Sequence, residues 1–329
     1  MHLSKIESVL NQLNEIEFNN LTLSIFQSQY QNNLVYRTFS QSLKTKPETI
    51  DHYSKIPFLP IEFFKSQDVI CNAKKDDFIV FTSSSTSGQT PSRHIVSDIT
   101  VYEKSFIKGF ELFYGKPSDY AIAALLPNYL ERKDSSLVYM FERLIKESAH
   151  PLSGFFMDDH DKLIDVLKTL KQQNKKTLLI GVTYALLDLA DKNIKLTDNF
   201  IVMETGGMKG KREELLKEEV HQILKQKFGV STIHSEYGMT ELLSQAYSKG
   251  DGLFDCPPWM KVLVRDTEDP LNYVKENKTG GLNIIDLANV NSCSFIATQD
   301  LGRSKGNGQF ELLGRFDNSD IRGCNLMVS

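Results

Sequence analysis

Three short apolar runs in the middle of the chain constrain its fold more than any other feature. They cover residues 121–126, 177–182 and 200–203, and stretches long enough for helices lie between or after them. A continuous apolar run of this length is typical of a strand that is buried on both faces. Buried strands that alternate with helices predict an α/β domain.

Two stretches have the spacing of amphipathic helices. The clearer one spans about residues 211–227, with Gly229 as the expected C-cap residue. The other follows Ser97 or Asp98, either of which can cap a helix. The apolar positions recur every three or four residues: Leu215, Leu216, Val220, Ile223 and Leu224 in the first helix, and Tyr102, Phe106, Phe110 and Phe113 in the second.

The two ends of the chain differ from this middle part. The first 45 residues or so are polar and predict two or three peripheral helices, one with Ile6, Leu10, Leu13 and Ile16 at helical spacing. Residues 56–65 hold two prolines, which remove backbone donors, so we expect an extended segment packed on the body. Short strand-like runs separated by turn signals predict a β-rich subdomain from about residue 255, and they cover 259–265, 281–286, 294–298 and 309–314.

Composition excludes several classes of protein. The chain has 329 residues, a net charge of −4 and a pI near 6.0, so neither nucleic acid nor an anionic membrane is expected as its main partner. Its N-terminus lacks the apolar region of a secretory signal, and no run of about 18 apolar residues occurs, so we expect a cytoplasmic protein without stable membrane insertion. The four cysteines form no CxxC pair, which suggests neither a zinc site nor a disulfide framework.

Residues 82–93 form a candidate binding loop. Eight of these twelve residues carry hydroxyls, and they follow the apolar run 78–81, which predicts a buried strand. Hydroxyls and backbone N–H groups can donate hydrogen bonds to a polyphosphate, and Arg93 can supply positive charge. The GxxxxGK[ST] spacing of a P-loop is absent. On this stretch alone, a disordered Ser/Thr linker is an equally good interpretation.

Further motifs follow this loop in a specific order. They are residues 204–210 (ETGGMKG), 236–241 (EYGMTE, after an expected strand at 232–234), and the pair 298–302 (TQDLG) and 314–323 (GRFDNSDIRG). Together they resemble the adenylate-forming (acyl-AMP) ligase superfamily. Residues 57–60, 205–210, 257–260 and 322–327 make the chain similar to the acyl-protein synthetases of the LuxE family. One such motif can occur by chance, but four in order are specific.

The resemblance spans about residue 35 to the end and carries expectations about architecture. It implies the large N-terminal domain of adenylate-forming enzymes, with mixed sheets flanked by helices and a small β-rich subdomain. We expect an adenylation core over residues 1–313 and a tail over 314–329 that carries the acyl-accepting cysteine. Relatives continue into a lid domain with a lysine that assists adenylation, whereas this sequence stops soon after Arg315. Arg93, Lys209, Lys211 and Arg322 are candidate substitutes for that lysine.

The resemblance also assigns site residues, with catalytic roles for Cys324, Thr240 and Arg93. Thr240 would donate to the α-phosphate and Glu241 would ligate Mg²⁺. Asp317 is expected to be structural, and His234 to be a satisfied histidine rather than a group at the reacting carboxylate. The nucleotide contacts implied are Ser84, Ser85, Thr86, Ser87 and Gly88 for the triphosphate, Gly206, Gly207, Tyr237 and Gly238 for the adenine, and Asp300 and Arg315 for the ribose or phosphate.

Several of these assignments have a structural alternative or depart from the family pattern. Ser85 stands where the family's loop has a glycine, and the usual lysine of the loop is missing. Paired glycines are often only turns, a tyrosine is often a core residue, and a glutamate is often a solvated charge. Only their order in the chain favours the site.

The implied activity is that of an ATP- and Mg²⁺-dependent acyl-protein synthetase. It would convert a carboxylic acid, by resemblance a fatty acid, to acyl-AMP and transfer the acyl group to Cys324 as a thioester for an NADPH-dependent acyl reductase. A thiolate is a good acceptor, and Arg322 nearby favours the thiolate, although a lone terminal cysteine can also be inert. Two other functions stay open: a ligase that passes the acyl group to coenzyme A, an amine or a sugar, and a degenerate nucleotide-binding module without turnover.

Overall fold

A large mixed sheet organises the computed structural model, which describes residues 9–10, 12–71, 78–84, 90–128, 130–206 and 215–316. The sheet has twelve strands, and eleven of them form one path with a twelfth strand beside it. Along that path the strands are β11 (Met260–Arg265), β12 (Thr279–Asp286), β13 (Phe295–Ser304), β14 (Phe310–Arg315), β10 (Leu253–Asp255), β9 (Ala246–Ser248), β8 (His234–Tyr237), β7 (Phe200–Thr205), β6 (Thr177–Val182), β4 (Ala121–Leu125) and β5 (Gly154–Phe155).

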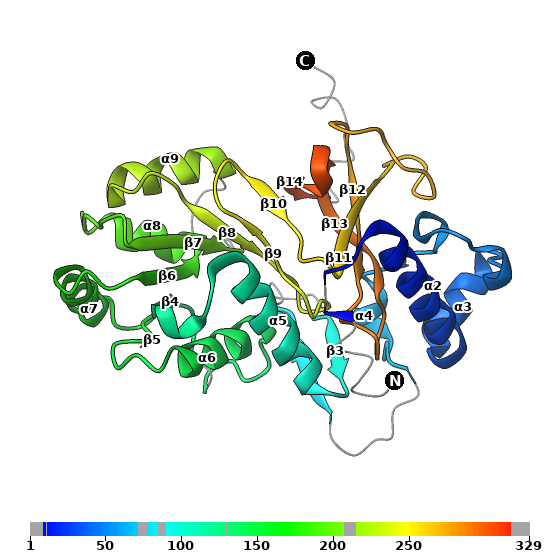
Figure 1. Cartoon of the computed structure of the whole chain (residues 1–329), viewed down its shortest axis with the longest axis horizontal. Helices are drawn as coiled ribbons and strands as arrows, with labels where there is room; N and C mark the ends of the chain where they lie inside the picture. Colours follow the sequence, from blue (N-terminus) through cyan, green and yellow to red (C-terminus); the bar gives the residue numbers. More distant parts are fainter. Residues whose placement is uncertain are drawn as a thin grey trace.

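One half of this sheet is parallel. β5, β4, β6, β7 and β8 pair in parallel, and every residue of β4 and β6 is buried. Helices α5 (Ile99–Tyr114), α6 (Ser136–Ser148), α7 (His160–Gln172), α8 (Thr183–Ala190) and α9 (Lys217–Phe228) surround these strands. Figure 1 shows α8 and α9 on one side of the strands and α5 and α6 on the other. The α/β prediction from the three apolar runs is therefore confirmed.

The other half is antiparallel and contains the β-rich region predicted after residue 255. β11, β12, β13 and β14 form a meander, and β14 pairs with β10, which pairs with β9. β9 pairs antiparallel with β8, so the meander continues the parallel half instead of forming a separate sheet. The expected strand at 294–298 is longer than predicted and includes Asp300.

The N-terminal region packs against this antiparallel half. α2 (Glu15–Asn32) and α3 (Leu34–Ser42) lie at the opposite end of the molecule from α7 (Figure 1). The proline-containing segment is extended only in its first part: β1 (Leu59–Pro60) pairs in parallel with β13, and the Tyr36 hydroxyl donates to Pro57 O at 2.8 Å, whereas residues 63–65 are helical. A short helix, α4 (Phe63–Ser66), follows.

Two apolar residues predicted to face the core are exposed. Ile16 is 73% exposed because α2 begins only at Glu15, where Asn14 and Glu17 form a capping box. Leu216 is 66% exposed because it precedes α9 and serves as its N-cap residue. The end of this helix is as predicted, with Gly229 as the C-cap of α9, but the helix begins at Lys217 and residues 215–216 are not helical. Asp98 caps α5, as one of the two predicted caps.

The strand before the hydroxyl-rich loop lies outside the large sheet. Among the described residues, β2 (Ile79–Thr82) pairs with β3 (Arg93–Val96) alone, in a two-stranded ribbon. Phe81 is fully buried, whereas Ile79 and Val80 are half-buried, so the predicted buried strand is only partly buried. Among the described residues, no helix is long and apolar enough to cross a membrane.

Candidate functional site

The ends of two neighbouring parallel strands bring two predicted motifs together. β7 ends at Thr205 and β8 at Tyr237, and Thr205 pairs with Glu236 across the two strands. Gly206 follows β7 with a φ of +69°, a left-handed conformation that favours glycine. In open α/β sheets, ligands bind at the carboxyl ends of the parallel strands. The glycine turn and the tyrosine therefore lie where a ligand site is expected, although Tyr237 ends a strand instead of lying in a loop.

Tyr237, Asp300 and Arg315 form a contiguous cluster. The Tyr237 hydroxyl donates to Asp300 Oδ2 at 2.7 Å, and Arg315 Nε lies 3.4 Å from Asp300 Oδ1. Burial raises the pKa of Asp300, while the Tyr237 hydrogen bond and the Arg315 charge act against that rise. The Tyr237 ring packs edge-on against Phe254 and Phe310. Residues far apart in sequence thus meet beside the end of β8, as their assignment to one site requires.

Glu241 belongs to the same electrostatic neighbourhood. Burial raises the pKa of its carboxyl, a hydrogen bond with Ser92 and the charge of Arg315 oppose the rise, and Asp300 adds to it. Mg²⁺ takes one or two carboxylates plus phosphate oxygens and water, so the carboxylate of Glu241 is a suitable ligand for that ion. No group of three or more potential metal-ligating side chains occurs among the described residues, so the site would need oxygens from the substrate.

The hydroxyl-rich loop is tied at its base. Thr82 donates its N–H to Asp134 O at 2.7 Å, and its hydroxyl contacts the Asp134 carboxylate. Across the loop, Ser83 N donates to Ser92 O at 3.1 Å and Ser92 N to Ser83 Oγ at 2.9 Å. Ser84 is exposed, and the remaining predicted phosphate contacts, Ser85, Thr86, Ser87 and Gly88, lie outside the described residues.

The comparisons with known proteins agree with this geometry. A family model described as "Acyl-protein synthetase, LuxE" matches residues 6–109 and 137–329. The chain belongs to the LuxE family. Comparison with curated proteins gives no match.

Solved structures place the LuxE-family chain among adenylate-forming enzymes. ATP-bound MatB from Rhodopseudomonas palustris shares 18% identity at a TM-score of 0.55 over 72% of this chain and 47% of that one. A 2-hydroxyisobutyryl-CoA ligase in complex with 2-HIB-AMP and CoA shares 13% identity at a TM-score of 0.69 over 92% of this chain and 70% of that one. The chain thus spans about half the length of MatB. At such identities the likeness concerns the fold, which is that of adenylate-forming enzymes.

The remaining predicted residues of this LuxE-family chain divide into two groups. Arg93 is half-exposed and its Nη1 lies 3.2 Å from Asp68 Oδ1, so part of its charge is already paired. The ring of His234 contacts the Tyr114 hydroxyl at 3.2 Å, which fits the expected satisfied histidine. Residues outside the described part of the chain are Gly207, Lys209, Lys211, Asp317, Arg322 and Cys324.

Sequence reasoning missed a buried ionic network behind the glycine turn. Glu204 Oε1 lies 2.8 Å from Lys217 Nζ and 3.4 Å from His221 Nε2. Although burial opposes ionisation, the Lys217 charge and the hydrogen bonds lower the pKa of Glu204 to about 2. The Thr183 hydroxyl bonds both Glu204 and the carbonyl of Gly206. The only local signal was a glutamate at the end of an apolar run.

The carboxyl group of Glu236, on the neighbouring strand β8, has a raised pKa where that of Glu204 is lowered. Burial raises the pKa of Glu236 to about 7, against a hydrogen bond from the Thr205 hydroxyl. A Cβ atom on Gly238 would lie 2.5 Å from Glu236 Oε1, so a larger residue at 238 would collide with this carboxyl group. A side chain at 238 would therefore require the carboxyl group of Glu236 to move.

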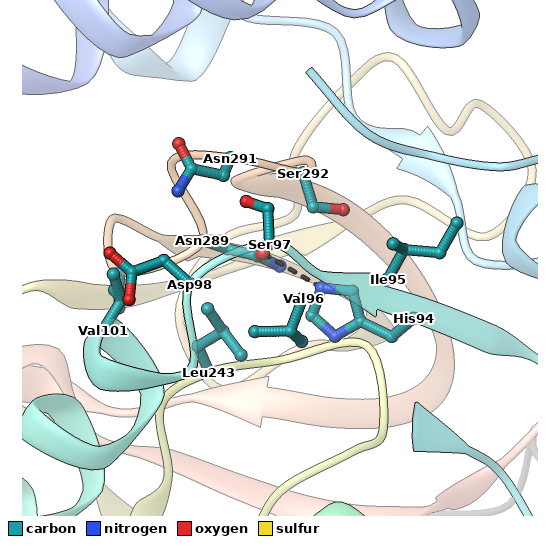
Figure 2. Close-up of a pocket in the computed structure, with 11 residues that line it drawn as sticks. His94, Ile95, Val96, Ser97, Asp98, Val101, Leu243, Asn289, Asn291 and Ser292 are labelled. Atoms are coloured by element: carbon teal, nitrogen blue, oxygen red, sulfur yellow. Dashed lines mark hydrogen bonds between the residues drawn. The ribbon is translucent and has the colours of Figure 1, made fainter. Parts of the chain in front are cut away.

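A small pocket of the structure lies elsewhere. Its lining includes His94, Asp98, Leu243 and Asn289, beside the start of α5 (Figure 2). None of the predicted nucleotide contacts lines it. One of its lining residues, His94, contacts Thr240 O through its ring.

Proposed function

We propose that this chain is an ATP-dependent acyl-protein synthetase that activates a carboxylic acid as its adenylate and then acylates one of its own cysteines. The observation that carries the proposal is the buried Tyr237–Asp300 hydrogen bond, flanked by Arg315, in a chain of the LuxE family. A buried carboxylate beside an aromatic ring and a cation suits a nucleotide, which offers hydroxyls, a flat base and phosphates.

The cluster suggests a role for each nucleotide-binding residue. Asp300 would accept hydrogen bonds from the ribose hydroxyls, and Tyr237 would hold the second carboxylate oxygen in place. Arg315, whose side chain is mostly exposed, would bind the ribose or a phosphate. Gly206 and Gly207 would let the adenine approach the backbone, and the aromatic ring of Tyr237 would face the other side of the adenine.

The phosphates would be held by the hydroxyl-rich loop at 84–88 and the 240–241 turn. Thr240 would donate to the α-phosphate, Glu241 would supply a ligand to Mg²⁺, and Arg93 would contribute charge. When bound, Mg²⁺ would offset the negative charge of the phosphates. The residues themselves would place the carboxylate of the acid in line with the α-phosphate, since positioning accounts for much of the rate of such a transfer.

The second step needs a nucleophile, and the cysteines differ in fitness for it. Burial raises the pKa of Cys71 to about 12 and also raises the pKa of Cys256 and Cys293, which makes all three poor nucleophiles. This supports Cys324 as the acceptor. Its thiolate would attack the acyl carbonyl carbon, forming a C–S bond while the bond to the AMP oxygen breaks, and the thiol proton would pass to solvent.

The proposal includes a substrate, a partner and a division of the chain. By family analogy the acid is a fatty acid and the partner is an NADPH-dependent acyl reductase that takes the thioester. Residues 1–313 would form the adenylation core and residues 314–329 the tail that carries Cys324, although Gly314 and Arg315 still pair with β13, so the part that moves between the two sites would begin after them.

Labelled fatty acid with ATP tests both half-reactions. We expect Cys324→Ala to keep ATP–pyrophosphate exchange within about twofold of wild type and to lose covalent label, whereas the matched control Cys71→Ala keeps both. Label that persists on Cys324→Ala would contradict the cysteine assignment. Absence of pyrophosphate exchange across a broad panel of acids, with ATP still bound, would favour a degenerate binding module.

One alternative acceptor is favoured by a specific comparison. The 2-hydroxyisobutyryl-CoA ligase covers 92% of this chain at a TM-score of 0.69, and its structure holds CoA. If coenzyme A is the acceptor, added CoA should release soluble acyl-CoA from wild type and from Cys324→Ala at equal rates. Under our proposal, Cys324→Ala forms acyl-AMP and no thioester.

A further inference from the structure

A buried histidine holds the segment that carries Thr240 and Glu241. His94 lies on β3, directly after the hydroxyl-rich loop, and is 1% exposed. Its Nδ1 lies 2.8 Å from Thr240 O, and a carbonyl oxygen can only accept. Nδ1 therefore carries the proton, and the ring ties the 240–241 turn to the base of the phosphate-binding loop.

Asn289 holds the next carbonyl of the same turn. Its Nδ2 donates to Glu241 O at 2.8 Å, its Oδ1 lies 3.2 Å from His94 Nε2, and the residue is fully buried. Figure 2 shows His94 and Asn289 joined by this contact at the wall of the pocket. Two consecutive carbonyls, those of residues 240 and 241, thus each receive one side-chain donor.

The loop that carries Asn289 is itself fixed. Gln29 Nε2, from α2, donates to Asn289 O at 2.9 Å. Asp286, at the start of the loop, accepts from Leu243 N at 2.7 Å and Ser244 N at 3.1 Å, just beyond the turn. The 240–244 segment is therefore bonded from both sides by groups that sit on the end of β12 and on β3.

Donor counting fixes the tautomer of the ring. Thr240 O and Asn289 Oδ1 both accept, and a neutral imidazole has one N–H. Burial lowers the pKa of His94 to about 4, so the ring is neutral near pH 7. The proton goes to the shorter contact, the one with Thr240 O, which makes His94 the Nδ1–H tautomer. Nε2 is then unprotonated, so its 3.2 Å contact with Asn289 Oδ1 is packing between two acceptors and not a hydrogen bond.

We propose that His94 and Asn289 are positioning residues for the nucleotide site, which fix the 240–241 backbone so that its side chains face Mg²⁺ and the α-phosphate. This inference rests on the proposed function. Neither residue would touch the substrate. Their effect is to keep a buried turn in one conformation, which matters because a misplacement of about 1 Å at a reacting site can cost on the order of 100-fold in rate.

The test compares two substitutions of His94 with a neighbour. His94→Leu removes the donor, whereas His94→Asn puts an amide N–H near the place of Nδ1. The matched control is Phe64→Leu, whose ring packs edge-on against His94 at 5.7 Å without bonding the turn. Measurements are the Mg²⁺ concentration for half-maximal ATP–pyrophosphate exchange, and hydrogen–deuterium exchange of the amides at 239–244.

We expect His94→Leu to raise the Mg²⁺ requirement and to speed amide exchange at 239–244, each by about 10-fold, which corresponds to one lost hydrogen bond. For both the Mg²⁺ requirement and the amide exchange, His94→Asn should stay within about threefold of wild type, and Phe64→Leu should equal wild type. Should His94→Leu fail to fold, Asn289→Ala gives the same readouts from the Glu241 side.

Three results would overturn the inference. They are unchanged amide exchange and Mg²⁺ requirement in His94→Leu, equal impairment in His94→Asn, or an Nε2–H tautomer of His94 in the ¹⁵N-imidazole spectrum of wild type. Amide exchange and the tautomer need no turnover. If the wild-type protein shows no pyrophosphate exchange, the proposed function is contradicted. Amide exchange and the tautomer of His94 would still decide whether His94 holds the turn.

Discussion

The parallel and antiparallel halves of the large sheet use their buried positions differently. Every position of β4 and β6 is buried, and the side chains are apolar apart from Thr177 and Gly181. In the antiparallel half, β12 and β13 bury Asn283, Asp286, Thr298 and Asp300. The outer parallel strands β4 and β6 thus fill the core with apolar side chains, whereas polar groups are buried on β7 and β8, where the two halves meet, and on β12 and β13.

The largest effect on stability should come from the parallel half. Leu179→Ala, in the centre of β6, should lower the free energy of unfolding by about 2–5 kcal/mol, because it removes a fully buried side chain and leaves a cavity. Urea unfolding measures the loss. The exposed Leu112 provides the control, since Leu112→Ala should change stability by less than about 0.5 kcal/mol. Equal losses in the two variants would contradict the assigned role of β6.

Asp300→Asn should show the reverse pattern. It keeps the shape of the side chain but removes the charge that would accept from the ribose, so kcat/KM for ATP in pyrophosphate exchange should fall about 100-fold. Its effect on stability should be smaller than that of Leu179→Ala. A variant that unfolds as easily as Leu179→Ala, with normal kcat/KM, would show that Asp300 serves the fold and not the site.

Glu236 sits at the boundary of the halves and predicts a pH dependence. Its pKa is about 7 in the folded state against 4.5 for an ordinary glutamate, so the folded state binds more protons between these values. Stability should therefore fall as pH rises from 4.5 to 7, by on the order of 1–3 kcal/mol. Glu236→Gln should remove this fall of stability with pH, whereas the control Glu111→Gln, at an exposed position, should retain it. Thermal unfolding at pH 5, 6, 7 and 8 measures both.

The smallest effect is expected from Tyr237→Phe. The ring remains against Phe254 and Phe310, and the hydroxyl loses its hydrogen bond to Asp300 and a weak one to Met239 Sδ at 3.9 Å. We expect KM for ATP to rise by up to about 10-fold and kcat to change little, since one hydrogen bond contributes roughly 1 kcal/mol. A change as large as that of Asp300→Asn would mean that the hydroxyl itself contacts the substrate.

Local patterns in the sequence predicted the elements better than the contacts between them. Periodicity identified the buried strands and α5, because burial repeats over neighbouring residues. It failed for Ile16 and Leu216, where capping decides the start of the helix. Tyr237 and Asp300 could be paired only through the family resemblance, being 63 positions apart. His94 and Asn289 gave no signal, because a single polar residue does not indicate a partner 195 positions away.

The N-terminal helices contact segments of the chain that are synthesised much later. Gln29 hydrogen-bonds a residue 260 positions later, and Phe26 and Tyr36 pack on Phe295. During synthesis Phe26 and Tyr36 leave the ribosome before Phe295 does. Their rings therefore stay exposed to water until β13 has also been synthesised. The first helices to form are thereby among the last to be covered, and an interrupted chain would offer their apolar faces to chaperones and proteases.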